Sequence, residues 1–129
     1  MTMPRRDILA AAGAVFVTGL TTRSVSFLAG GTMYGLIGKM SAVPGQRDAL
    51  AAILLEGTAR MPGCLSYVVA SDPADADGLW ITEVWDSQES HRASLTLPAV
   101  QEAIAKGRPM IAGFSNRVET TPLGGHGLR

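Results

Sequence analysis

The sequence predicts an α+β domain of the ferredoxin-like type, in which helices cover one face of an antiparallel sheet. The predicted elements follow the order β-α-β-β-α-β, which is the order of that fold. Pro-Gly pairs and a loop of turn-forming residues separate them. The length of 129 residues allows one compact domain, which we place at residues 33–122.

The first 32 residues differ from the rest and have the pattern of an export signal. Arg5-Arg6 precedes an apolar run of small residues that ends near Leu20, which is typical of a twin-arginine signal. This run is shorter than the roughly 20 residues that a membrane-spanning helix needs. We therefore expect an exported, periplasmic or extracytoplasmic protein with no stable membrane span. If the signal is not used, the protein is cytoplasmic.

The first strand and the first helix come from two contrasting patterns. Residues 33–40 mix aromatic and aliphatic side chains and predict a strand. Over residues 46–61 the apolar positions recur at helical spacing: Leu50, Ile53, Leu54, Gly57 and Met61. Pro62-Gly63 should end this helix, because proline cannot continue it.

Two strands joined by a short loop follow. Residues 64–71 and 79–85 are rich in β-branched and aromatic side chains and predict a pair of strands. The connecting sequence, DPADADG, partly matches a calcium-binding loop. However, its first ligand position falls on Pro73, which cannot bind calcium through its side chain. We therefore predict a plain hairpin loop and no metal site.

A capped helix should begin directly after the third strand. Asp86 or Ser87 is the expected cap, with Glu89 or Ser90 three residues later as its partner. Pro98 then starts a second helical run.

The C-terminal part of the chain predicts a helical face, a last strand and a tail. We expect Val100, Ile104 and Ile111 on one helical face, because they recur at helical spacing. Residues 115–121 alternate and predict the last strand, and residues 123–129 predict a flexible tail.

Both faces of the third strand are rather apolar, which bears on assembly. Leu79 and Ile81 lie on one side, and Trp80 and Val84 on the other. A solvated back face would be polar. We therefore expect a second copy of the chain to cover it, because symmetric dimers are the commonest soluble oligomers.

The residues that could carry chemistry gather in residues 78–100, which hold both tryptophans and one of the two histidines. Alternation places Ile81, Glu83 and Trp85 on one face of the third strand, and a hairpin that turns near the middle of its loop brings Tyr67 opposite Glu83. No basic stripe is present, so a nucleic acid is not an expected partner.

This segment resembles the antibiotic biosynthesis monooxygenase family, which includes small quinol monooxygenases. The resemblance rests on EVWDS at residues 83–87 followed by a helix, on the Pro-Gly-Cys of residues 62–64 and on the Thr-Thr-Pro of residues 120–122. It covers roughly residues 33–123. It implies a dimeric α/β barrel with a pocket between sheet and helices in each subunit.

The resemblance also implies oxidation of a phenolic or quinol-type aromatic compound by O₂ without any cofactor. In related enzymes the tryptophan at the strand end and a polar residue six positions later line the pocket, which here are Trp85 and His91. We predict His91, Trp85 and Glu83 as catalytic residues, and Tyr67, Trp85 and Ile81 as substrate-binding residues. His91 is the candidate base, because an ordinary imidazole changes its charge near physiological pH.

Structural roles compete with each of these functional roles. His91 would then be a surface residue, Trp85 would be part of the core, and Glu83 would pair with Arg117 or Lys39.

The sequence also departs from the family. Many members carry histidines further along the helix, where this chain has Ser94 and Ala99. The alternative function is therefore a non-catalytic dimeric barrel that binds a hydrophobic small molecule.

Overall fold

The computed structural model describes residues 32–128. The predicted export signal lies outside these residues, apart from Thr32, and stays a prediction. The described elements are β1 (Tyr34–Ala42), α3 (Arg47–Gly57), β2 (Cys64–Ser71), β3 (Gly78–Trp85), α4 (Gln88–Ser94), α5 (Pro98–Gly107), the short 3-10 helix η1 (Arg108–Met110) and β4 (Ile111–Thr120). This order confirms the predicted α+β, ferredoxin-like fold.

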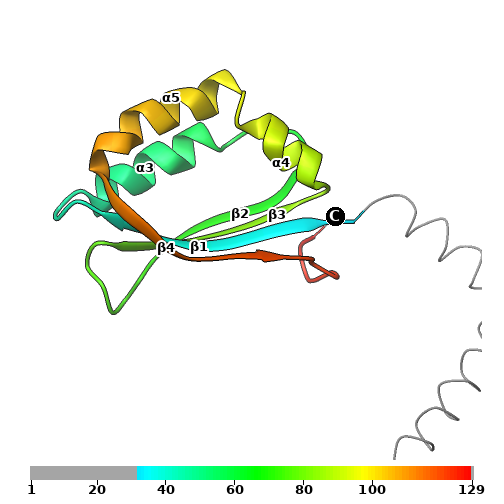
Figure 1. The fold of residues 1–129 in the computed structure, drawn as a ribbon, viewed down its shortest axis with the longest axis horizontal. Helices are drawn as coiled ribbons and strands as arrows, with labels where there is room; N and C mark the ends of the chain where they lie inside the picture. Colours follow the sequence, from blue (N-terminus) through cyan, green and yellow to red (C-terminus); the bar gives the residue numbers. More distant parts are fainter. Residues whose placement is uncertain (1–31, 129) are drawn as a thin grey trace, which may run out of the picture. The chain divides into compact units, whose positions relative to one another are not determined.

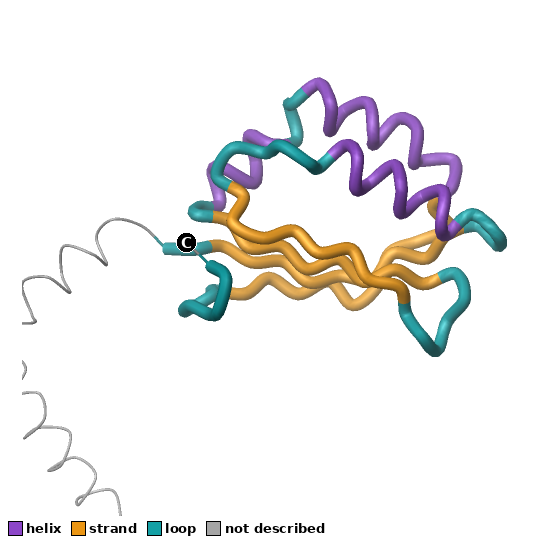
Figure 2. Tube along the Cα trace, turned by 180° about the vertical axis from the view of Figure 1, so that it is seen from behind, coloured by secondary structure: helices purple, strands orange, loops and turns teal. Residues whose placement is uncertain are grey.

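The four strands form one antiparallel sheet in the order β2-β3-β1-β4. All three α-helices lie on the same face of this sheet (Figures 1 and 2). None of the described helices is both long enough and apolar enough to cross a membrane. The buried cluster at the centre of the helix-covered face comprises Ala42, Leu50, Leu79 and Ile81.

The first helix ends at Gly57, before the Pro62-Gly63 pair that was expected to end it. The backbone N–H of Thr58 and its hydroxyl both donate to the carbonyl of Leu54, at 3.0 and 2.6 Å, and close the last turn. A Cβ atom on Gly57 would overlap the Cβ atom of Ala103. Glycine therefore lets α3 and α5 approach closely at this point.

The expectation that Ile111 belongs to a helical face is wrong. Helix α5 ends at Gly107, and Ile111 is the first residue of β4, where it pairs with Ala42. The backbone N–H of Val43 donates to the carbonyl of Met110 at 2.8 Å and fixes this corner. The last strand therefore begins four residues earlier than predicted, at Ile111 instead of residue 115.

The uncovered face of the sheet carries a row of mostly apolar residues. In the strand register Ile37 pairs with Thr82 and Val118, and Thr82 pairs with Val68. Ile37, Val68 and Val118 are 36%, 50% and 51% exposed. The described residues thus leave an apolar strip across all four strands, as the pattern of the third strand predicts.

An ion-pair network fixes the β2–β3 hairpin loop. Lys39 Nζ lies 3.1 Å from Asp72 Oδ2 and 2.9 Å from Asp75 Oδ2, and the indole N–H of Trp80 donates to Asp72. The backbone N–H of Ala74, the indole and Lys39 all stabilise the Asp72 carboxylate and lower its pKa. Lys39 is therefore engaged by the loop and does not pair with Glu83.

Candidate functional site

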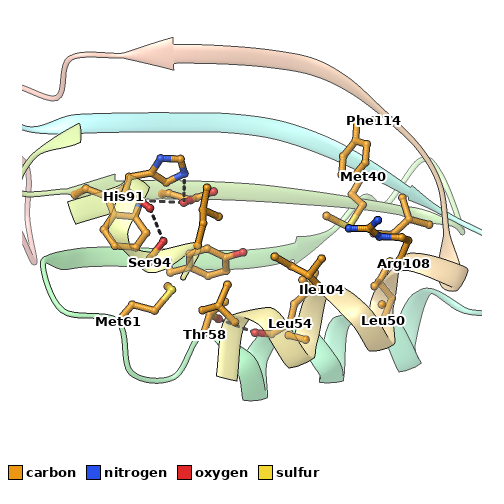
Figure 3. Close-up of a pocket in the computed structure, with 18 of the residues that line it drawn as sticks. Met40, Leu50, Leu54, Thr58, Met61, His91, Ser94, Ile104, Arg108 and Phe114 are labelled. Atoms are coloured by element: carbon orange, nitrogen blue, oxygen red, sulfur yellow. Dashed lines mark hydrogen bonds and ion pairs between the residues drawn. The ribbon is translucent and has the colours of Figure 1, made fainter. Parts of the chain in front are cut away.

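A cavity of about 710 Å³ lies between the sheet and the helices. Its lining is largely apolar and includes Val100. Figure 3 labels further apolar lining residues, among them Met40, Leu54, Met61, Ile104 and Phe114. Its polar lining residues are Thr58, Tyr67, Glu83, His91, Ser94 and Arg108. The volume lies in the range of pockets that hold small molecules.

The turn from β3 into α4 positions His91 at this cavity. Ser87 is the N-cap of α4, and its hydroxyl accepts a hydrogen bond from the backbone N–H of Ser90 at 3.1 Å. The backbone N–H of Asp86 donates to the carbonyl of Gly63 at 2.9 Å and ties the start of the turn to the β2 side. The capped first turn therefore places His91 just beyond the end of β3.

His91, Glu83 and Trp85 form one connected group. The indole N–H of Trp85 donates to Glu83 Oε1 at 2.9 Å, and His91 Nε2 lies 4.0 Å from the same oxygen, as the dashed lines of Figure 3 mark. The Glu83 and His91 side chains are 17% and 18% exposed. Trp85 holds the carboxylate where it can stabilise a protonated imidazole.

Trp85 serves both as core and as cavity wall. Its side chain is 1% exposed, yet it lines the cavity and meets His91 edge to face, with ring centroids 5.4 Å apart. A buried tryptophan with its N–H satisfied is a rigid support for neighbouring groups. The packing role and the pocket role are therefore compatible at this position.

Tyr34 packs against His91 and was missed by the sequence reasoning. Its ring centroid lies 5.3 Å from that of His91, and its hydroxyl donates to Glu119 Oε2 at 2.5 Å. Burial and the negative charge of Glu119 raise the pKa of Tyr34. No local signal marks Tyr34, because it meets this group only through its pairing with Trp85 across β1 and β3.

Tyr67 lies opposite Glu83 in the β2–β3 register, as predicted, and both line the cavity. Burial, followed by the charge of Glu83, raises the pKa of the Tyr67 phenol strongly. None of the side-chain hydrogen bonds found within residues 32–128 involves its hydroxyl. It therefore remains protonated at neutral pH and can donate a hydrogen bond to a bound molecule.

Ile81 does not line this cavity with the other predicted residues. It packs in the core with Leu79 and borders a second hollow of about 430 Å³. This hollow shares Tyr67 and Glu83 with the main cavity. Ile81 lies further from α4 along β3 and fills the space beneath α3, so strand alternation alone could not separate it from Glu83.

The alternative ion pairs of Glu83 are wrong. Lys39 binds the hairpin loop, as described above. Arg117 Nη2 lies 3.8 Å from Glu119 Oε2. Within residues 32–128, no three His, Cys, Asp or Glu side chains converge as a metal site requires.

Comparisons with known proteins agree with this architecture. The sequence pattern of the family described as "Antibiotic biosynthesis monooxygenase" matches residues 33–106. A crystal structure from Chloroflexus aurantiacus, described by the same family name, is 70% identical to the chain. That match covers 75% of this chain and 99% of the other, with a TM-score of 0.74. No curated protein matches the chain.

More distant solved structures share the fold. A protein of Nitrosomonas europaea described by the same family name is 15% identical, covers 72% of this chain and 92% of its own, and has a TM-score of 0.66. One from Caulobacter crescentus is 18% identical, with 75% and 93% covered and a TM-score of 0.61.

Proposed function

Because the chain belongs to the antibiotic biosynthesis monooxygenase family, we propose that it oxidises a small phenolic or quinol-type aromatic compound with O₂ and needs no cofactor. The observation that carries the proposal is the imidazole of His91 beside the carboxylate of Glu83 at the wall of an apolar cavity. A base next to an apolar space is what this chemistry requires.

The proposed reaction begins with proton transfer from a phenol whose para carbon carries hydrogen. His91 accepts the phenolic proton, and Glu83 stabilises the imidazolium that forms. The hydroxyl of Tyr67 donates a hydrogen bond to the phenolate oxygen. The apolar walls exclude water and hold the ring, so that the electron-rich anion meets O₂ in a dry space.

Oxygen then enters the substrate. The phenolate gives one electron to O₂, and the radical and superoxide combine through a new bond between the para carbon and oxygen. The peroxide anion takes the proton back from His91. Transfer of the para C–H proton to His91 and cleavage of the O–O bond give a quinone and hydroxide, which takes that proton and leaves as water. The substrate supplies all the electrons.

Turnover by metal-free protein tests this reaction. A panel of para-unsubstituted phenols and naphthols is incubated aerobically with chelator-treated protein. We expect O₂ consumption that equals quinone formation, with no hydrogen peroxide. Hydrogen peroxide released in the same amount as the O₂ consumed would indicate an oxidase and contradict the proposed oxygen insertion.

Tyr67→Phe should lower kcat/KM by about tenfold, because it removes one hydrogen bond to a charged substrate oxygen. The fold should persist, because the lost hydroxyl takes part in none of the side-chain hydrogen bonds of residues 32–128. Tyr34→Phe is the matched control: it keeps the ring beside His91 and removes a hydroxyl already bonded to Glu119. Equal losses for both variants would contradict the role of Tyr67.

The alternative is a protein that binds an aromatic molecule without oxidising it. It is favoured by the presence of a single histidine among the cavity-lining residues of the described chain, with Ser94 further along the same helix. Tight binding of a quinone analogue, together with no O₂ consumption across the panel, would support this alternative over the enzyme.

We also propose that two copies of the chain pair through the uncovered face of the sheet. The strip of Ile37, Thr82, Val68 and Val118 supports the proposal, because a stable monomer seldom exposes a continuous apolar row.

Ile37→Lys should weaken the dimer at least tenfold, because it places a charge in the apolar contact. Analytical ultracentrifugation over a concentration series measures the effect. Leu55→Lys is the control, since Leu55 is an exposed apolar residue on α3. A dimer unaffected by Ile37→Lys would place the contact elsewhere.

A further inference from the structure

We infer that the cavity takes aromatic substrates that bear a carboxylate, and that Arg108 binds this carboxylate at the end of the cavity away from His91. The inference rests on the proposed function for the position of the reacting hydroxyl. It adds a substrate class and a specificity residue to the same site.

The first observation is the place of Arg108. It is the only lysine or arginine among the cavity-lining residues of the described chain. Figure 3 shows it with Met40 and Phe114 at one end of the drawn residues, and His91 with Ser94 at the other. Arg108 opens η1, where its backbone N–H donates to the carbonyl of Ile104 and anchors it at the end of α5.

The second observation is that the guanidinium has no carboxylate partner among residues 32–128. Two other cations in this part of the chain lie near a carboxylate. Lys106 Nζ lies 3.9 Å from Glu102 Oε2, and Arg117 Nη2 lies 3.8 Å from Glu119 Oε2. An arginine presents several N–H donors in a planar fork that matches a carboxylate. The guanidinium of Arg108 can therefore bind the carboxylate of a molecule in the cavity.

The third observation is the direction of charge along the cavity. Glu83, the one carboxylate that residues 32–128 contribute to the lining, lies beside His91. An anionic group of the substrate would be repelled at that end and attracted at the Arg108 end. Apolar side chains, including Leu54 and Ile104, lie between the two ends (Figure 3). The cavity therefore orients an aromatic acid with its hydroxyl toward His91.

Binding under nitrogen tests the inference without any turnover. The probes are meta-hydroxycinnamate, whose para carbon carries hydrogen, and its neutral amide, which differ only in the group expected at Arg108. Calorimetry should show that the native protein binds the carboxylate roughly 10- to 100-fold more tightly than the amide. No preference for the carboxylate, or no binding of either probe, would overturn the inference.

Variants at Arg108 and Lys106 test whether Arg108 causes the preference for the carboxylate probe. Arg108→Met should abolish the preference and leave the affinity for the amide unchanged, and Arg108→Lys should restore part of it. Lys106→Met removes the same charge from the same helix end but outside this cavity, so it should keep the preference. A preference that survives Arg108→Met would contradict the role of Arg108.

Different results test the carboxylate site and the proposed reaction. His91→Ala should retain the carboxylate preference, because the two residues lie at opposite ends of the cavity. Preference with no O₂ consumption by the native protein would refute the monooxygenase and keep the carboxylate site. Turnover of neutral phenols without any preference for the carboxylate probe would refute the carboxylate site and keep the monooxygenase.

Discussion

Replacing His91 with alanine should lower kcat/KM for phenol oxidation by roughly 100- to 10,000-fold, the usual loss when a general base is removed. The variant should fold, because His91 contributes no hydrogen bond from its side chain to the described chain, and its closest charged partner is Glu83 at 4.0 Å. Initial rates of O₂ consumption at saturating and limiting substrate measure the effect.

The chain provides a matched control for this substitution in its second histidine. His126 lies exposed near the end of the described chain and does not line the cavity. His126→Ala should therefore leave kcat/KM unchanged. If His91→Ala also leaves kcat/KM unchanged, His91 is not the base and the assigned site is wrong.

Replacing Gly63 with alanine should destabilise the domain by about 3 kcal/mol and lower activity with it. Gly63 has a φ angle of +84°, a left-handed conformation that costs other residues roughly 1–2 kcal/mol. A Cβ there would also lie 2.5 Å from Ser90 Cβ and 2.9 Å from Asp86 Oδ1, and such crowding costs roughly 1–3 kcal/mol. Denaturant unfolding measures the loss.

Gly45→Ala separates these two causes. Gly45 has a similar φ angle of +82°, but nothing lies within 4 Å of a Cβ placed on it. It should therefore lose only the conformational part, about 1–2 kcal/mol. Because Ser90 precedes His91, Gly63→Ala should also shift the base, whereas Gly45→Ala should not. Equal unfolding free energies for the two variants would contradict the contact with α4.

The parts of the fold that sequence reasoning could predict are those with local signals. Residues 64–71 form the predicted strand, and Ser87 is one of the two expected caps. The facing of Tyr67 and Glu83 follows from hairpin register, which a short loop and strand alternation together determine. These signals involve neighbours in the chain, so one sequence contains them.

The parts that sequence reasoning missed depend on contacts between distant elements. Helix α3 ends at Gly57 rather than at Pro62-Gly63, where Gly57 packs against Ala103 of α5. Ile111 keeps helical spacing in the sequence, yet pairing with Ala42 draws it into a strand. At both positions, contacts between distant elements override the structure that the local sequence pattern predicts.

The candidate site divides in the same way. Glu83, Trp85 and His91 come from one continuous segment, so the strand and the helix cap predicted their neighbourhood. Tyr34 comes from the start of the domain and reaches His91 only through the pairing of β1 with β3, and Arg108 reaches the cavity only from the end of α5. Neither carries a local motif that would have marked it.

The measurement that tests the central proposal most directly is turnover under isotopically labelled O₂ with a para-unsubstituted phenol and metal-free protein. The proposed reaction requires that one labelled atom enters the quinone and the other appears in water, and that His91→Ala abolishes the labelling while His126→Ala does not. Quinone without the label, or equal labelling in the native protein and His91→Ala, would contradict a monooxygenase that uses His91 as its base.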